Sequence, residues 1–167
     1  MINVAGYEKE SYTDGIGIRY TVFTQGCKHN CIGCHNPQTH SFDTVELVEI
    51  ADIIEDIKEN EMLDGITLSG GDPFYQAEEC AKLAKRVKEE LKLNVWAYTG
   101  FVMEELLKSS DASIQELLKY IDVIVDGPFI INKRQLALRF RGSSNQRFID
   151  VKKSLQANNI VLYNVAE

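Results

Sequence analysis

Short apolar runs that end in glycine alternate with segments of helical periodicity along most of the chain, and this alternation limits the fold more than any other feature. Apolar, β-branched runs predict strands, and apolar residues spaced three or four apart predict helices. The predicted strands are 18–24, 65–69, 94–98, 123–125 and 160–163, and the predicted helices are 44–57, 77–91, 102–108 and 113–120. Such alternation gives right-handed crossovers and a parallel sheet with helices outside it. The sequence therefore predicts an α/β fold whose ligand lies at the carboxyl ends of the strands.

The size and charge of the chain exclude several classes of protein. Its 167 residues indicate a single domain, 1–167, and a net charge of −7 disfavours binding to nucleic acid or anionic lipid. No apolar run approaches the roughly 20 residues that span a bilayer, and the start of the chain does not resemble a signal peptide. We expect a cytoplasmic protein without nucleic-acid or membrane partners.

Three of the four cysteines fall within eight positions, directly after the first predicted strand. Cys27, Cys31 and Cys34 form a C-x3-C-x2-C pattern. Four cysteines are too few for a disulfide scaffold, and such a cluster in a reducing compartment favours metal binding. Thiolates select zinc, copper(I) or iron–sulfur clusters.

Several kinds of metal site fit this cluster from the sequence alone. A structural zinc site could use His29, His35 or His40 as a fourth ligand. Residues 31–35 also spell C-x-x-C-H, the c-type haem attachment sequence, but haem attachment and a thioredoxin-like pair both leave the first cysteine without a role. An electron-carrier cluster needs four cysteines, and Cys80, within a predicted helix, is typical of a buried apolar residue. Three cysteine ligands on a four-iron cluster would leave one iron open to a small molecule, which indicates a catalytic role rather than electron storage.

The cysteine loop, together with a Gly-Gly-Asp-Pro turn after the second predicted strand, resembles the radical S-adenosylmethionine superfamily. Within it, the chain is similar to the family of activating proteins of anaerobic (class III) ribonucleoside-triphosphate reductase. The segments that carry this resemblance are 24–27 (TQGC), 33–36 (GCHN), 68–73 (LSGGDP), 96–100 (WAYTG), 125–129 (VDGPF) and 140–146 (FRGSSNQ). The cysteine spacing indicates resemblance to the superfamily, and the RGSSNQ stretch narrows the resemblance to the family of these activases.

The resemblance implies a cofactor for the cysteines. Cys27, Cys31 and Cys34 would hold a 4Fe-4S cluster whose fourth iron chelates the amino and carboxylate groups of S-adenosylmethionine. Gly33, Cys34 and His35 would run alongside this cofactor. The superfamily usually has Tyr or Phe where this chain has His35, and an imidazole can also stack on adenine.

The strand ends would supply the remaining cofactor contacts. Gly70 and Gly71 would let the backbone approach the methionine end of S-adenosylmethionine, and Asp72 would help to fix its amino group. Thr99, with Tyr98 beside it, and Asp126 occupy further positions that would face the cofactor. Each of these residues also has an ordinary explanation in a turn or a cap.

The family's activity would follow from these cofactors. The reduced cluster gives one electron to the sulfonium, and the resulting 5'-deoxyadenosyl radical removes a hydrogen from a glycine Cα of the anaerobic reductase. A flavodoxin- or ferredoxin-like protein would donate the electron, and no general acid or base is required. The alternatives are an activase of another glycyl-radical enzyme and a non-catalytic zinc or iron–sulfur module.

The chain is too short for a complete eight-fold barrel, which needs about 250 residues. We expect an open, partial (β/α) barrel of mostly parallel strands, whose open side would admit a peptide loop of the reductase. Residues 133–153 carry a local charge of +6, which leaves −13 on the remainder. We hypothesise that this basic segment contacts the reductase or an acidic electron donor.

Overall fold

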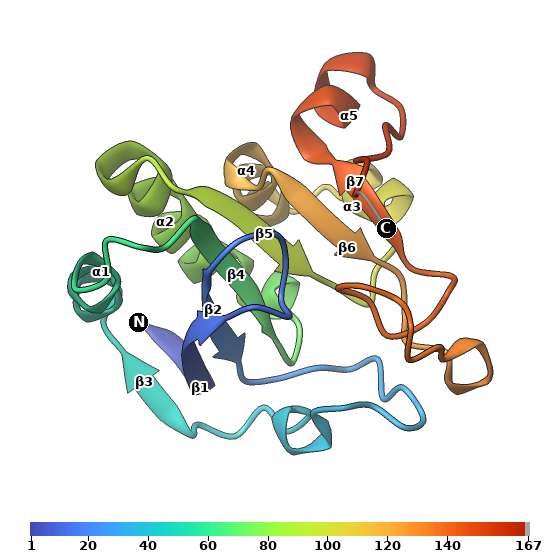
Figure 1. Cartoon of the computed structure of the whole chain (residues 1–167), viewed down its shortest axis with the longest axis horizontal. Helices are drawn as coiled ribbons and strands as arrows, with labels where there is room; N and C mark the ends of the chain where they lie inside the picture. The colour runs from blue at the N-terminus through green and yellow to red at the C-terminus, as the bar shows by residue number, and fades with distance from the viewer. Residues whose placement is uncertain (166–167) are drawn as a thin grey trace.

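The computed structural model describes residues 1–165, which form a mixed sheet of seven strands flanked by helices (Figure 1). The strand order is β3-β1-β2-β4-β5-β6-β7. The parallel strands at the centre are β2 (Arg19–Thr24), β4 (Gly65–Gly70), β5 (Asn94–Tyr98) and β6 (Val123–Asp126). The antiparallel strands are β1 (Ile2–Ser11), β3 (Glu46–Val48) and β7 (Arg147–Asp150). The predicted α/β class is confirmed.

Helices fill the crossovers between the parallel strands. They are α1 (Ile50–Lys58), α2 (Ala77–Arg86), α3 (Met103–Lys108) and α4 (Ala112–Tyr120), and α5 (Val151–Ala157) follows β7. The parallel strands are adjacent in chain order, so successive right-handed crossovers return on the same face. Figure 1 shows α2 and α4 behind the sheet and α1 at its left side. None of the helices in residues 1–165 has the length and apolar character that a bilayer crossing needs.

The main core lies between the central strands and these helices. Side chains alternate along a strand, so every second residue of β2 and β4 points towards the helices. Val22, Ile66 and Leu68 are fully buried there, against Leu83 of α2. A smaller cluster around Trp96 lies apart from this core and includes residues of β5, β6 and β7. These two clusters hold the strands in place and therefore fix the positions of the strand ends.

The structure differs from the prediction mainly at the edges of the sheet. The predicted strand 160–163 is wrong, because only a single bridge, between Leu162 and Ile149, forms there. The last strand is instead β7, followed by α5, in a region where the sequence predicted no element. The helix predicted from residue 44 starts at Ile50, because residues 46–48 pair with β1 as strand β3. The helix predicted over 77–91 is confirmed, although it continues beyond α2 as a π-helix over Val87–Leu91.

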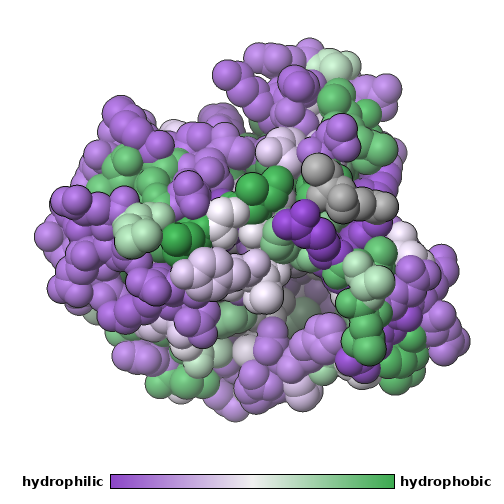
Figure 2. Space-filling view, viewed as in Figure 1, coloured by the Kyte–Doolittle hydropathy of each residue, from purple (hydrophilic) through white to green (hydrophobic). Residues whose placement is uncertain are grey.

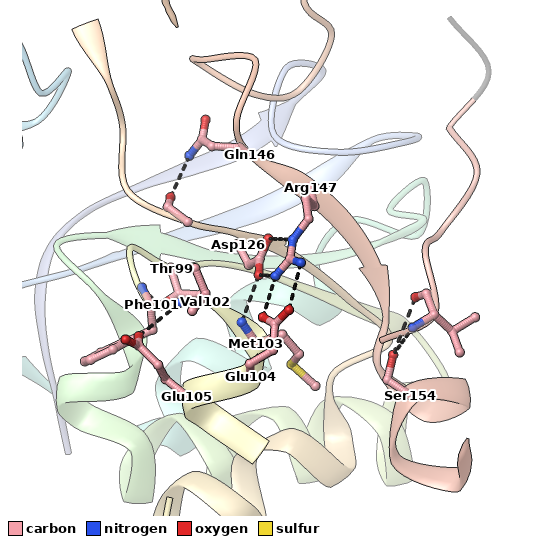
Figure 3. A network of polar contacts seen from close by, with 12 residues as sticks. Thr99, Phe101, Val102, Met103, Glu104, Glu105, Asp126, Gln146, Arg147 and Ser154 are labelled. Carbon is pink, nitrogen blue, oxygen red and sulfur yellow. Dashed lines mark hydrogen bonds and ion pairs between the residues drawn. The ribbon is translucent and has the colours of Figure 1, made fainter. Parts of the chain in front are cut away.

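A network of charged groups joins β6, β7 and α3 (Figure 3). Asp126, at the end of β6, is 1% exposed and accepts hydrogen bonds from the Arg147 guanidinium and from the backbone N–H of Met103, 2.8 Å away. Arg147 also donates to both carboxylate oxygens of Glu104, at 3.0 and 2.7 Å. Asp126 precedes the long segment 127–146 and Arg147 follows it, so the network connects the two ends of this segment.

This network gives the stability of the fold a pH dependence. Hydrogen bonds from Arg147 lower the pKa of Glu104 from 4.5 to about 2. A carboxylate with a lower pKa in the folded chain adds stability above its unfolded pKa, and this stability is lost as the pH falls through its folded pKa. Arg147→Met also leaves the buried Asp126 carboxylate unpaired. We expect the variant to lose about 3 kcal/mol in the free energy of unfolding at pH 7.

The part of the loss that comes from Glu104 should shrink between pH 4.5 and pH 2, because this carboxylate becomes protonated in the variant and then in the original chain. Urea unfolding at several pH values measures it. Glu104→Gln is the matched control and should cost under about 1 kcal/mol, because Glu104 is 46% exposed. A loss of the same size at every pH would contradict this account.

Candidate functional site

A cavity of about 760 Å³ opens at the carboxyl ends of the parallel strands. In the view of Figure 2 a recess is visible at this edge, below the strand ends drawn in Figure 1. The cavity is bordered by seven of the nine residues predicted to bind the metal or the cofactor, namely Cys27, Cys31, Cys34, His35, Gly70, Gly71 and Thr99. Gly33 and Asp72 are not among its lining residues.

The register of the sheet explains why distant segments meet here. Thr24 of β2 lies opposite Gly70 of β4, and Tyr98 of β5 lies opposite Val125 of β6. Parallel strands in this register end at about the same level, so the turns that follow them share one edge. The cysteine loop, the Gly-Gly-Asp turn and the Thr99 turn therefore come together.

The three loop cysteines are free thiols with different exposure. Cys27 is 9% exposed, whereas Cys31 and Cys34 are partly exposed. A turn closes between the last two, with the Cys34 N–H donating to the Cys31 carbonyl over 3.1 Å. Gly33, at φ +75°, and Asn30, at φ +49°, adopt the left-handed conformation that this tight path requires.

The chemistry of this donor set fits a multi-iron group. Burial raises the pKa of the Cys27 thiol to about 11, partly offset by a hydrogen bond from the backbone of His29. Such a thiol gives up its proton when a cation binds to it. The three thiols border the cavity, and an iron–sulfur cluster takes thiolates at separate corners.

Cys80 lies apart from this centre. It is 0% exposed within α2 and belongs to the main core. Burial raises the pKa of its thiol well above the ordinary value. The interpretation of Cys80 as a small buried apolar residue is therefore confirmed.

Gly70 and Gly71 allow two turns to touch backbone to backbone. Gly70 has a φ of +94°, and a Cβ placed on it would lie 2.5 Å from the backbone nitrogen of Thr24. A Cβ on Gly71 would lie 2.4 Å from the carbonyl oxygen of Gly26. The Gly71 N–H donates to Thr24 over 2.7 Å, and the next N–H donates to Gly26 over 3.0 Å. Packing therefore requires both glycines, in addition to any contact with a cofactor.

Asp72 lies behind the cavity wall with its carboxylate occupied by protein groups. It is 0% exposed, and its Oδ1 accepts the Phe74 N–H over 3.0 Å, which caps the 3-10 helix Pro73–Gln76. Its Oδ2 lies 2.9 Å from His29 Nε2 and accepts from the Thr99 hydroxyl at 2.8 Å and the Gly100 N–H at 2.9 Å. A role for Asp72 at the amino group of a cofactor stays a prediction.

Segment 127–146 forms a cavity wall that the sequence analysis did not foresee. The residues that it contributes to the lining include Phe129, Leu138, Arg139, Phe140, Arg141 and Gly142. Tyr98, at the end of β5, donates its hydroxyl to the Phe140 carbonyl over 2.7 Å, and the ring of His35 lies 5.1 Å from that of Phe129. Asp126 is not among the lining residues, because it belongs to the charged network at the base of this segment.

The RGSSNQ stretch folds this wall. The Gln146 side chain accepts from the N–H groups of Gly142 and Ser143, at 2.8 and 3.1 Å. It also donates to the Gly127 carbonyl over 3.1 Å, and this is the bond drawn at Gln146 in Figure 3. Asn145 donates to the Pro128 carbonyl over 2.8 Å. These bonds from side chain to backbone connect the two ends of the wall, and the motif therefore determines the shape of the cavity.

Comparisons with known proteins agree with this site. The family described as a 4Fe-4S single cluster domain matches residues 13–149, which defines the chain as an iron–sulfur domain protein. The anaerobic ribonucleoside-triphosphate reductase-activating protein of Vibrio cholerae is 40% identical over 152 residues, 87% of this chain and 96% of the relative. Its namesakes in Haemophilus influenzae and Escherichia coli K12 are 37% and 33% identical, with the same coverage. The chain belongs to the family of anaerobic ribonucleoside-triphosphate reductase-activating proteins.

The contact between the two turns can be tested with a matched pair of glycines. Gly70 and Gly127 have nearly equal φ angles, +94° and +95°, but the nearest atom to a Cβ on Gly127 is 3.7 Å away. Alanine carries the same backbone penalty at both positions, so the difference between them measures the contact. We expect Gly70→Ala to lower the free energy of unfolding by about 2 kcal/mol more than Gly127→Ala in urea denaturation. Equal losses would show that the contact is not tight.

Proposed function

We propose that this chain is the activase of an anaerobic ribonucleoside-triphosphate reductase, an oxidoreductase of the radical S-adenosylmethionine type. The observation that carries the proposal is the convergence of Cys27, Cys31 and Cys34 on a cavity at the carboxyl edge of the sheet. Membership of the family, whose relatives are named for activating this reductase, supplies the target.

In the proposed site, the chain binds and orients its cofactors. Cys27, Cys31 and Cys34 would hold a 4Fe-4S cluster with one iron left for S-adenosylmethionine. When bound, the two cofactors would supply one-electron chemistry, the reductive cleavage of S-adenosylmethionine that would lead to removal of a hydrogen atom from a reductase glycine. The protein's tasks are binding, orientation and the exclusion of competing reactions.

The cavity offers surfaces suited to S-adenosylmethionine. Its volume of about 760 Å³ falls within the range of ligand pockets, about 300 to 1,000 Å³. We propose that Gly70, Gly71 and Thr99 contact the methionine end of the cofactor. Gly33, Cys34 and His35 would lie along it, with Asp72 supporting the site near the amino group.

The fold suits a partner that enters from one side. We propose that residues 1–167 are a single radical S-adenosylmethionine domain with an open, partial (β/α) barrel. The sequential order of β2, β4, β5 and β6, with one helix-containing crossover after another, supports this proposal. The four free thiols suit the reducing cytoplasm, where we propose that the protein acts. We expect neither nucleic acid nor membranes among its partners, because the net charge is −7.

Cleavage of S-adenosylmethionine is the direct test of this function. The chain is reconstituted anaerobically with iron and sulfide, reduced with dithionite and assayed for 5'-deoxyadenosine, with Cys27→Ser as the control. We expect about four irons and four sulfides per chain, and product only from the unsubstituted chain. One zinc per chain, or equal product from both chains, would contradict the proposal.

We further propose that the basic part of the wall contacts the reductase, while a flavodoxin- or ferredoxin-like protein supplies the electron. A protein that inserts a segment into the cavity must cover the wall, where Lys133 and Arg134 are exposed and Leu136 is 89% exposed. The Arg139 guanidinium lies over the ring of Phe140, and the Arg141 guanidinium lies over the ring of Phe148. Substitution of these two residues would also remove contacts within the chain, so they are less suitable for a test of partner binding.

Charge reversal of the two exposed cations tests this contact. Lys133→Glu with Arg134→Glu should weaken binding of the reductase at least about tenfold at low salt and reduce its salt dependence, since opposite charges attract over about 10 Å at 0.1 M salt. Binding is measured by interferometry at several salt concentrations. Formation of 5'-deoxyadenosine without the reductase should remain unchanged. Unaltered affinity and salt slope would exclude this surface.

A further inference from the structure

His29 lies inside the cysteine loop, two residues from Cys27 and two from Cys31, and bonds to a buried carboxylate. Its Nε2 is 2.9 Å from Asp72 Oδ2. The His29 side chain is 17% exposed and that of Asp72 is 0% exposed. A hydrogen bond to a charged group that water barely reaches is stronger than one on the surface.

The His29 ring packs against two aromatic rings and a glycine. The ring meets Phe101 edge-on, with 4.6 Å between centroids, and lies 5.8 Å from the ring of Tyr75. A Cβ placed on Gly100 would lie 2.5 Å from His29 Cδ2. Any larger residue at position 100 would displace the ring. The end of β5 therefore leaves a space that the His29 ring fills.

The Asp72 carboxylate, which is hydrogen-bonded to His29, joins three separate segments. The same Oδ2 of Asp72 accepts from the Thr99 hydroxyl and the Gly100 N–H, which follow β5, while Oδ1 caps the turn after β4. The cysteine loop, in contrast, contains no helix or strand between residues 25 and 36. His29 thus connects the middle of this loop to two rigid strand ends, beside Lys28, whose ammonium group lies over the ring of Tyr75.

We propose that His29 is a positioning residue, which by bonding to Asp72 holds the cysteine loop in the conformation that receives the iron–sulfur cluster. The inference rests on the proposed function only in that this loop binds the cluster. In this arrangement the Nε2 of the imidazole is occupied by Asp72. The loop is arranged by the protein before the metal binds, and less ordering is required when it does.

Trypsin gives a local measure of this tie in the metal-free chain. Lys28 is exposed and directly precedes His29, so cleavage after Lys28 reports opening of the loop. We expect cleavage about tenfold faster in His29→Ala, which loses the hydrogen bond. His29→Gln, which keeps an N–H donor, and His40→Ala, a histidine change in the same connection, should stay near the original rate. Each rate is divided by that of the same variant in urea, because the residue after Lys28 changes.

Asp72→Asn tests the other partner without altering the trypsin site. Its amide keeps one acceptor oxygen where the carboxylate has two, so it cannot accept all four hydrogen bonds, and cleavage at Lys28 should again rise. The second readout is the rate at which reconstituted protein loses iron to a chelator. We expect this rate to be about tenfold higher in His29→Ala than in the original chain, His29→Gln or His40→Ala.

The outcomes separate this inference from the proposed function. Unchanged cleavage and unchanged iron loss in His29→Ala would overturn it. Equal defects in His29→Gln and His29→Ala would also overturn it, as would a lower melting temperature without faster cleavage at Lys28 below that temperature. If the original chain takes up no iron, the proposed function fails, while the trypsin measurements still decide whether His29 holds the loop.

Discussion

Two turns that touch backbone to backbone determine where the cysteine loop lies. The turn after β4 packs on the turn after β2 because Gly70 and Gly71 have no side chains, and two N–H groups of the first turn donate to carbonyls of the second. Cys27 follows that contact directly. Asp72 comes from the same contact and reaches across to the end of β5. The cavity and the thiols that border it are consequences of this arrangement.

The parallel centre of the fold is predictable because each of its strands is a buried apolar run closed by a glycine-containing turn. The edges are less predictable because their pairing depends on partners distant in sequence. β1 buries only alternate residues such as Ile2 and Val4 and leaves Glu8 exposed, so its composition is polar. β7 follows a polar stretch and is held by the ion pair between Arg147 and Asp126. The apolar run 160–163 suggests a strand, but makes only one bridge.

The candidate site also has one part that is predictable from the sequence and one part that is not. Cysteine spacing and glycine turns are local signals, so the three cysteines and the two glycines that border the cavity could be named from the sequence. The bonds that hold them could not, because they join positions far apart: His29 to Asp72, and Tyr98 to Phe140. The wall 127–146 was unreadable for a related reason. Its shape comes from side-chain amides such as that of Gln146, which leave no periodic pattern.

The burial of Cys80 bears on how the protein withstands air. A thiol with no solvent contact and a raised pKa reacts slowly with oxidants, whereas Cys31 and Cys34 are partly exposed and linked by a turn. In the metal-free chain, oxidants therefore reach the thiols of the loop more readily than the thiol of the core. A disulfide between two loop thiols would be reversible by thiol exchange, whereas the buried Cys80 would leave the packing of the core unchanged.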